Sequence, residues 1–427
     1  MKPLILSLFL SALASSAMAQ SETTKTDPDI SKTCSSTSSE TPVLFIWDAR
    51  DLAFTREKIA NGNKTLKPAF DALMKEADAA LEKGPYSVMH KTKTPPSGNK
   101  HDYYSIGPYW WPDPKKKDGL PYKRKDGETN PERYDDSFDK VQISNFMDDV
   151  ETLSLAAYFT GNKAYAEHAA KLVKAWFLNP STRMNPNLNF AQAIPGKTDG
   201  RGIGIIDSYG FVKVIDSIGL LNHAGTLTSQ EIDALKEWFS EYALWMLTSD
   251  NGKEERAATN NHGVYYDAQL MAFSAFAGDM KAVKFFADGI KSSRIPGQIN
   301  KKGQLPLELK RTRPFHYTAY TLNAFFDAAD VAECVGINIW DYETPKSQSL
   351  KDAILYQAQY AYNLQAWPFK EIRDLNPRGL YHNLLRADYV YDENIIDSGI
   401  ASLDGKYESD PANLTYPTGS RLLHPNE

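Results

Sequence analysis

Residues 158–169 read YFTGNKAYAEHA, and residues 275–286 read AFAGDMKAVKFF. In both stretches an apolar helical pattern ends near a glycine, and a second helical pattern begins almost at once. Gly161 and Gly278 suit the left-handed conformation that closes a helix. A weaker copy of the pattern, AECVGINIW, covers residues 332–340. Because so short a turn makes neighbouring helices antiparallel, these stretches predict repeated helical hairpins.

Helical periodicity of apolar residues dominates the chain, and strand signals are weak. We expect helices or helix pairs over 54–82, 139–159, 163–178, 207–222, 229–248, 262–277, 279–292, 316–335 and 350–364. Hairpins stacked without strands form either an open solenoid or a closed α/α toroid. Two long loops, 100–135 and 183–206, interrupt the helices, and loops of this length in compact domains are usually functional or disordered. The sequence therefore predicts an all-α fold.

The N-terminus has the features of an export signal. Lys2 precedes the apolar run LILSLFLSALA, and Ala17 and Ala19 form the small-x-small pattern of a cleavage site. The run is too short for a permanent membrane anchor. We therefore expect a signal peptide over 1–19, a disordered polar leader over 20–41 and a single folded domain over 42–427. The mature protein is expected to be periplasmic or secreted, without a membrane association.

Charge and cysteine content narrow the possible partners. The chain has 48 Lys and Arg against 54 Asp and Glu, a net charge of −6. This balance argues against a nucleic-acid partner, and we expect a monomer or a weak dimer. Cys34 lies in the polar leader and Cys334 in a helical pattern, so we expect no disulfide between them.

The stretch NNHGVYYDAQ, residues 260–269, is unusual for a core helix. Thr259 or Asn260 can cap the helix, which places Asn261 and His262 in its first turn. The helix dipole disfavours a charged imidazole there, and a neutral histidine can act as a base or a donor. Tyr266 shares a helix face with His262. The alternative is a capped helix whose histidine only bonds a backbone carbonyl.

The stretch ELKRTRPFHYTAY, residues 308–320, combines arginines with tyrosines. Arg311 and Arg313 end a loop, and Pro314 starts a helix that carries Tyr317 and Tyr320. Two guanidinium groups beside a helix N-terminus favour an anion site. A phenol beside an arginine is expected to have a lowered pKa. The alternative is a solvated basic turn above a tyrosine core contact.

The two long loops carry further candidates for ligand contacts. The first contains DYYSIGPYWWPDP, residues 102–114, whose flat rings can stack on sugar faces or anchor the loop to the core. The second contains NFAQAIPGKTDGRGIG, residues 189–204, whose glycine spacing does not fit a phosphate-binding motif.

Taken together, these four stretches resemble the alginate lyase superfamily of polysaccharide lyases, in the branch that includes alginate and glucuronan lyases. The resemblance covers about residues 100 to 340. It implies an α/α toroid, an incomplete barrel of helical hairpins, with long aromatic loops lining a groove. It also implies β-elimination on an acidic polysaccharide or oligosaccharide of 1,4-linked uronates, either alginate, including its mannuronate-containing forms, or glucuronan.

The resemblance also implies the catalytic residues. The family's Asn-His pair falls on Asn261 and His262, its arginine on Arg311, and its tyrosine on Tyr317, while Arg313 and Tyr320 offer a competing register. Asn261 and Arg311 are expected to neutralise the uronate carboxyl group, and Tyr317 to act as base and acid in turn. His262 is the base in the opposite geometry, or keeps Tyr317 ionised. The expected substrate-binding residues are Tyr104, Tyr109, Trp110, Trp111, Gln192, Arg201, Tyr266, Arg313 and Tyr320.

Two other functions fit parts of the pattern. A glycoside hydrolase on the same toroid needs two carboxylates flanking the bond, and its candidates are Asp135, Asp136, Asp139, Asp148 and Asp149. A non-catalytic periplasmic glycan-binding protein would use the aromatic loops alone. No HExxH, CxxC or EF-hand spacing is present, so we expect no metal and no cofactor in the chemistry.

Overall fold

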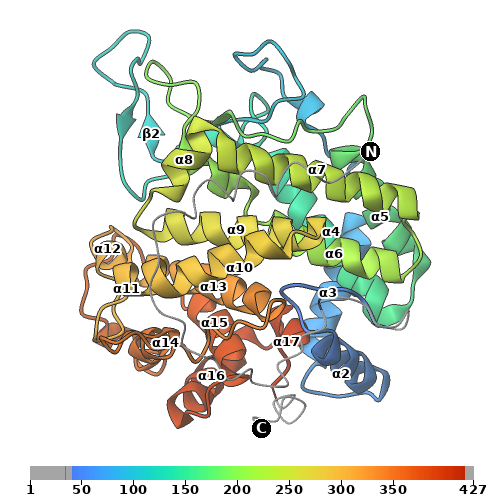
Figure 1. Ribbon diagram of the computed structural model, residues 1–427, viewed down its shortest axis with the longest axis vertical. Coiled ribbons are helices and arrows are strands. Elements are labelled where there is room, and N and C mark those ends of the chain that lie inside the picture. The colour runs from blue at the N-terminus through green and yellow to red at the C-terminus, as the bar shows by residue number, and fades with distance from the viewer. Residues whose placement is uncertain (1–33, 35–40, 419–427) are drawn as a thin grey trace.

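The computed structural model describes Cys34 and residues 41–418, so the predicted signal peptide and almost all of the leader lie outside the described residues. Helices dominate this part of the chain (Figure 1). The longer ones are α2 (Ala49–Ala60), α3 (Lys67–Ala80), α4 (Lys140–Thr160), α5 (Lys163–Phe177), α6 (Phe211–His223), α7 (Ser229–Thr248), α9 (Asn261–Ala277), α10 (Met280–Gly289), α13 (Pro314–Glu333), α14 (Leu350–Ala358), α15 (Arg378–Asp388) and α16 (Asn394–Tyr407). The shorter ones are η2 (Val88–His90), η3 (Pro131–Tyr134), η4 (Gly202–Ser208), α8 (Asp250–Arg256), η5 (Ile290–Arg294), α11 (Ile295–Gln298), α12 (Pro306–Leu309), η6 (Leu364–Ala366) and α17 (Ala412–Thr415).

Two of the three glycine turns that predicted hairpins are confirmed, whereas after the weaker copy at 332–340 no helix begins before α14. Gly161 ends α4 with φ 70° and Gly278 ends α9 with φ 89°, both in the left-handed region where only glycine is unstrained. The next helix begins within two residues, capped by the side chain of Asn162 before α5 and of Asp279 before α10. Each hairpin therefore has a closed end and a capped start, as the sequence predicts.

The hairpins stack into an α/α toroid. Helix α4 packs against α3, α5 and α6, helix α9 against α7, α10 and α13, and helix α13 against α15. The last helix, α17, contacts α2 and α3, so the two ends of the described chain meet (Figure 1). Most side chains of α9 and α13 are buried, with exposed fractions of 0–8%, because these helices are apolar nearly all round. Asn261 and His262 lie at the N-terminus of α9 and Tyr317 near that of α13, and Arg311 lies in the segment just before α13.

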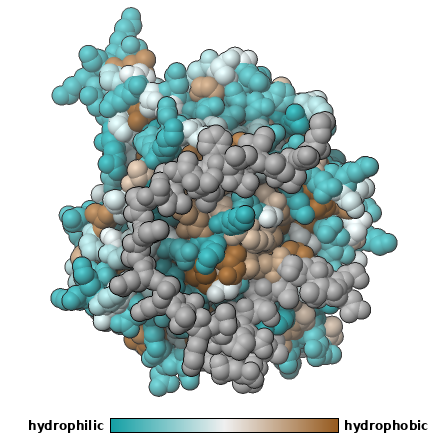
Figure 2. Space-filling view, viewed as in Figure 1, coloured by the Kyte–Doolittle hydropathy of each residue, from teal (hydrophilic) through white to brown (hydrophobic). Residues whose placement is uncertain are grey.

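Short strands organise the two long loops. Strand β1 (Tyr104–Ile106) pairs in parallel with β4 (Phe190–Ala193), which ties the first loop to the second. Strand β2 (Trp110–Trp111) pairs with β3 (Lys123–Arg124) in an antiparallel ribbon. The ribbon stands out from the helical body at the upper left of Figure 1, and the matching projection in Figure 2 is mostly hydrophilic.

The expectation about the cysteines is wrong. Cys34 and Cys334 form a disulfide that joins the leader to the C-cap of α13 across 300 residues of sequence. The polar composition of the leader did not predict this disulfide, because local composition carries no information about a contact with a distant helix end. Within the described residues, no helix is long and apolar enough to cross a membrane.

Candidate active site

Asn261 is held by a buried carboxylate. The Glu308 side chain, 1% exposed on α12, accepts the backbone N–H of Asn261 at 2.8 Å and its side-chain amide at 2.9 Å. Asn260 occupies the N-cap position and α9 begins with Asn261 and His262, as predicted, but the Asn260 side chain makes no capping hydrogen bond. The acceptor for the helix end comes from a segment 47 residues away in sequence, which local sequence rules do not reach.

His262 is held by a second buried carboxylate. Its Nδ1 lies 2.8 Å from Oε1 of Glu255, which is completely buried on α8. The imidazole therefore bonds a carboxylate and not a backbone carbonyl, which was the alternative interpretation of this histidine. Burial raises the pKa of Glu308, and the hydrogen bonds from Asn261 and the charge of Arg311 oppose that rise. Glu308 therefore interacts with residues of both motifs, Asn261 in the first and Arg311 in the second.

Arg311, Tyr317 and Tyr109 form one hydrogen-bonded group. Arg311 donates to the hydroxyl of Tyr317 at 2.8 Å and to Asp126 at 2.9 Å, and the hydroxyl of Tyr109 lies 2.6 Å from that of Tyr317. The expectation of a lowered phenol pKa is wrong in this structure. Burial and the neighbouring Tyr109 raise the pKa of Tyr317, and they outweigh the opposing charge of Arg311. Tyr317 is therefore protonated at neutral pH in the free protein.

Arg201 and Gln192 lie together beside the first loop. Arg201 donates to both the backbone and the side-chain oxygen of Gln192 at 2.9 Å, and Gln192 donates to the buried Asp207 at 3.0 Å. Gln192 adopts φ 49°, an unfavourable conformation for a residue with a Cβ. Burial lowers the pKa of Arg201 to about 10. Among the described residues Arg201 forms no ion pair, which leaves its charge available for a ligand.

The aromatic loop residues are partly exposed and carry basic neighbours. Lys197 lies 4.5 Å from the ring centre of Trp110, and Arg201 lies 5.9 Å from it. Lys125 lies 4.8 Å from the ring centre of Trp111, whose indole N–H bonds the loop backbone. Tyr104 packs edge-on against Phe138 in a small cluster of its own.

Three other residues predicted to contact the substrate differ in their exposure. Tyr266 is completely buried and donates to the Met246 carbonyl at 2.9 Å, so its assignment as a substrate contact is wrong. Tyr320 is partly exposed, and its ring packs against Tyr265. Arg313 is partly exposed at the start of α13 and makes no ion pair with a described residue. The helical spacing of Tyr266 from His262 was correct, but α9 is buried on that side as well.

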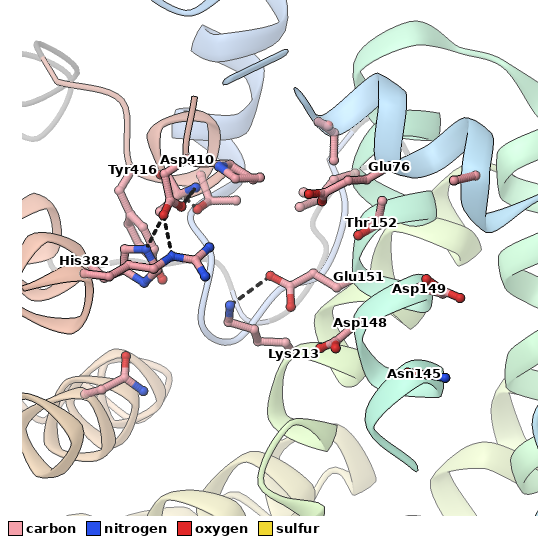
Figure 3. A pocket seen from close by; sticks show the side chains of 18 of the residues that line it. Glu76, Asn145, Asp148, Asp149, Glu151, Thr152, Lys213, His382, Asp410 and Tyr416 are labelled. Atoms are coloured by element: carbon pink, nitrogen blue, oxygen red, sulfur yellow. Dashed lines mark hydrogen bonds and ion pairs between the residues drawn. The ribbon is translucent and has the colours of Figure 1, made fainter. Parts of the chain in front are cut away.

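A cavity of about 620 Å³ lies away from these motifs, between α3, α4, α6 and α15. Figure 3 shows the Glu151–Lys213 pair facing Asp410 and His382 across it. None of the four predicted catalytic residues lines it. Of the carboxylates considered for a hydrolase, Asp148 and Asp149 line this cavity, Asp139 pairs with the buried Lys91, and Asp135 and Asp136 are exposed. In the described part of the chain, no group of three His, Cys, Asp or Glu side chains could hold a metal ion.

Four carboxylates that support the site were not predicted from the sequence. Glu255, Glu308, Asp126 and Asp207 each hold one or more predicted residues, and three of the four are nearly or completely buried. Glu308 lies inside the ELKR motif, and Glu255 precedes His262 by seven residues, so both were visible as acids close to a candidate site. Charged residues in such positions usually face solvent, and only the fold shows their burial.

Comparisons with known proteins show the family and the fold of the chain. The family model described as alginate lyase matches residues 87–367. An alginate lyase from Bacteroides ovatus is 36% identical, with a TM-score of 0.83 over 88% of this chain and 100% of that one. Alginate lyase A1-III from Sphingomonas species A1 is 14% identical, with a TM-score of 0.57 over 88% of this chain and 96% of that one. A variant of A1-III complexed with a tetrasaccharide gives a TM-score of 0.54 at 15% identity, over 82% of this chain and 86% of that one. No match to a curated protein sequence was found. The family model covers well over half of the residues, and the chain therefore belongs to the alginate lyase family and is a polysaccharide lyase.

Proposed function

We propose that this lyase cleaves 1,4-linked uronate polymers, either alginate, including its mannuronate-containing forms, or glucuronan, by β-elimination. The proposal is supported by two contacts: Asn261, which starts α9 beside His262, is held by Glu308 of the ELKR stretch, and Arg311 of the same stretch donates to Tyr317 on α13. A uronate C5 proton is weakly acidic, and its removal concentrates negative charge on the adjacent carboxyl group. Such chemistry needs hydrogen-bond donors and a guanidinium on one side, and proton carriers on the other.

In the proposed reaction, Arg311 and Asn261 stabilise the negative charge of the uronate carboxyl group. Tyr317 first loses its phenol proton to solvent. The phenolate then accepts the C5 proton, and the C5–H electron pair becomes the C4–C5 double bond. The C4–O4 bond breaks, and Tyr317 returns the proton to O4 of the leaving sugar. One phenol can perform both transfers where the proton and the leaving group lie on the same ring face. A preorganised donor of this kind contributes about 3 kcal/mol to catalysis.

The remaining polar and aromatic residues are proposed to bind the polymer on either side of the cleaved linkage. Arg201 and Arg313 have no ion-pair partner among the described residues, so each can take a carboxylate. Trp110, Trp111 and Tyr109 offer flat faces to sugar rings. Tyr104, Gln192 and Tyr320 contribute at the edges of the same region. The predicted export signal agrees with an enzyme that meets its polymer outside the cytoplasm.

The experiment measures near-ultraviolet absorbance of the unsaturated product on polymannuronate, polyguluronate and glucuronan. We expect the wild type to generate absorbance on at least one polymer and Tyr317→Phe to lose about 10³-fold or more of the rate. Tyr362→Phe, which alters a tyrosine that is 52% exposed, is the matched control and should retain the wild-type rate. Reducing ends formed without absorbance, or full activity of Tyr317→Phe, would refute the proposal.

A further inference from the structure

The short helix α8 carries two adjacent carboxylates that contact residues of the candidate site. Glu254 accepts the backbone N–H of Gly202 at 2.7 Å, next to Arg201, and Glu255 contacts His262. Glu255 is 0% exposed, and its second oxygen, Oε2, has no hydrogen-bond partner. Among the described residues, the imidazole of His262 is thus the only hydrogen-bond partner of the buried Glu255 carboxyl group. A buried carboxylate in this position favours a proton on the nitrogen that faces it.

The contact fixes which nitrogen of His262 is free. A neutral imidazole carries one N–H and one lone pair, and a hydrogen bond from Nδ1 to Glu255 leaves the lone pair on Nε2. Nε2 bonds no described residue, and the His262 side chain is 17% exposed. A carboxylate bound to Nδ1 also stabilises the imidazolium that forms when Nε2 takes a proton.

We propose that Glu255 is a positioning residue for His262: it holds the proton on Nδ1, so that Nε2 keeps the lone pair that the base role already expected of His262 requires when the C5–H of the uronate faces away from Tyr317. This inference rests on the proposed elimination. The C5–H electron pair becomes the C4–C5 double bond, the C4–O4 bond breaks, and O4 takes the phenol proton of Tyr317. Solvent then removes the proton from His262 and returns one to Tyr317.

The protonated state of Tyr317 is consistent with His262 as the base and Tyr317 as the acid. Burial raises the pKa of Tyr317, so the free protein holds it as a phenol that can donate a proton at once. A pathway with His262 as base needs no prior loss of that proton. The same site thereby gains a second proton acceptor, and with it access to polymers that are C5 epimers of one another.

Other charged groups lie around the Glu255–His262 pair. Glu254 on α8 and Arg201 on the second loop act on Glu255, and Glu308 on α12 interacts with His262 and Arg311. On α9 itself Asp267 is paired with Arg294, so that pair contributes little net charge. Glu255 is the member in direct contact, and its removal should change the imidazole most.

The first test compares Glu255→Gln with the wild type on every polymer that the wild type degrades. Glutamine keeps the shape of the side chain and removes its charge. We expect the rate on at least one polymer to fall about tenfold or more, with the acid limb of kcat/KM moving to lower pH because imidazole protonation is less favoured. Glu237→Gln, an exposed carboxylate on α7, is the control and should match the wild type. A Glu255→Gln enzyme with wild-type rates and pH profile on all polymers would overturn the inference.

The second test does not depend on turnover. Nitrogen-15 spectra of histidine-labelled protein should show the Nδ1–H tautomer for His262, assigned through a His262→Gln variant, and Glu255→Ala should lose that signature. Finding the Nε2–H tautomer in the wild type would overturn the inference and leave the proposed elimination standing. Lack of unsaturated product on every polymer would instead sink the elimination itself, and the base role of His262 with it, whatever the tautomer.

Discussion

The hydroxyl oxygen of Tyr109 lies 2.6 Å from that of Tyr317, and this bond joins the aromatic loop to the proposed catalytic helix. Arg311 shares the Tyr317 hydroxyl and also binds Asp126, at the far end of the same loop. The loop therefore contacts the site at two points, one phenol and one carboxylate. Changes in the loop should consequently reach the ionisation of Tyr317.

Tyr109→Phe should shift the pH dependence of the reaction. Burial is the main reason that the pKa of Tyr317 is raised, and Tyr109 raises it further. Removing the Tyr109 hydroxyl lets Tyr317 lose its proton more easily. Where ionised Tyr317 is the base, the alkaline rise of kcat/KM should therefore move to lower pH. Tyr122→Phe, in the same loop but bonded to Glu132, should leave the rise in place. An unmoved profile in Tyr109→Phe would separate Tyr317 from the base role.

Arg201→Gln should weaken binding more than it slows chemistry. Arg201 lies between Gln192 and Trp110 without an ion-pair partner in the described residues, so a substrate carboxylate can meet its charge. A contact made equally in ground and transition states changes KM and leaves kcat almost unaltered. We expect KM on polymer to rise about tenfold, which corresponds to the loss of one charge-assisted hydrogen bond. Arg201→Lys should recover part of the loss. A fall in kcat at constant KM would show instead that Arg201 acts on the transition state.

The ribbon of β2 and β3 should attract the polymer electrostatically. Its tip carries Lys115, Lys116 and Lys117, all exposed, on a chain whose net charge is −6. Replacing all three by glutamate should lower kcat/KM on polymer several-fold at low salt, with the difference vanishing as salt screens the charges. The matched control replaces three exposed lysines on outer helices, Lys171, Lys236 and Lys281. Equal losses in both triple variants would assign the effect to net charge and not to the ribbon.

Local sequence patterns predicted the helical hairpins, and failed where distant segments meet. Gly161 and Gly278 act within a few residues of chain, so the hairpins could be located from sequence. The tertiary partners of Asn261 and Tyr317 lie 47 and 208 residues away, and the burial that raises the pKa of Tyr317 exists only after folding. Tyr266 shows the same limit, because periodicity gives its helix face but not what covers that face.

The disulfide between Cys34 and Cys334 should stabilise the folded chain. It encloses 300 residues, and a crosslink reduces the conformational freedom of the unfolded chain, by about 2–4 kcal/mol in typical proteins. Cys34→Ser should therefore lower Tm, and reductant should lower the Tm of the wild type to a similar value without affecting the variant. Activity below the transition should persist, because Cys334 lies at the C-terminal end of α13 and Tyr317 at its N-terminal end. A wild-type Tm that is indifferent to reductant would mean that the bridge adds no stability.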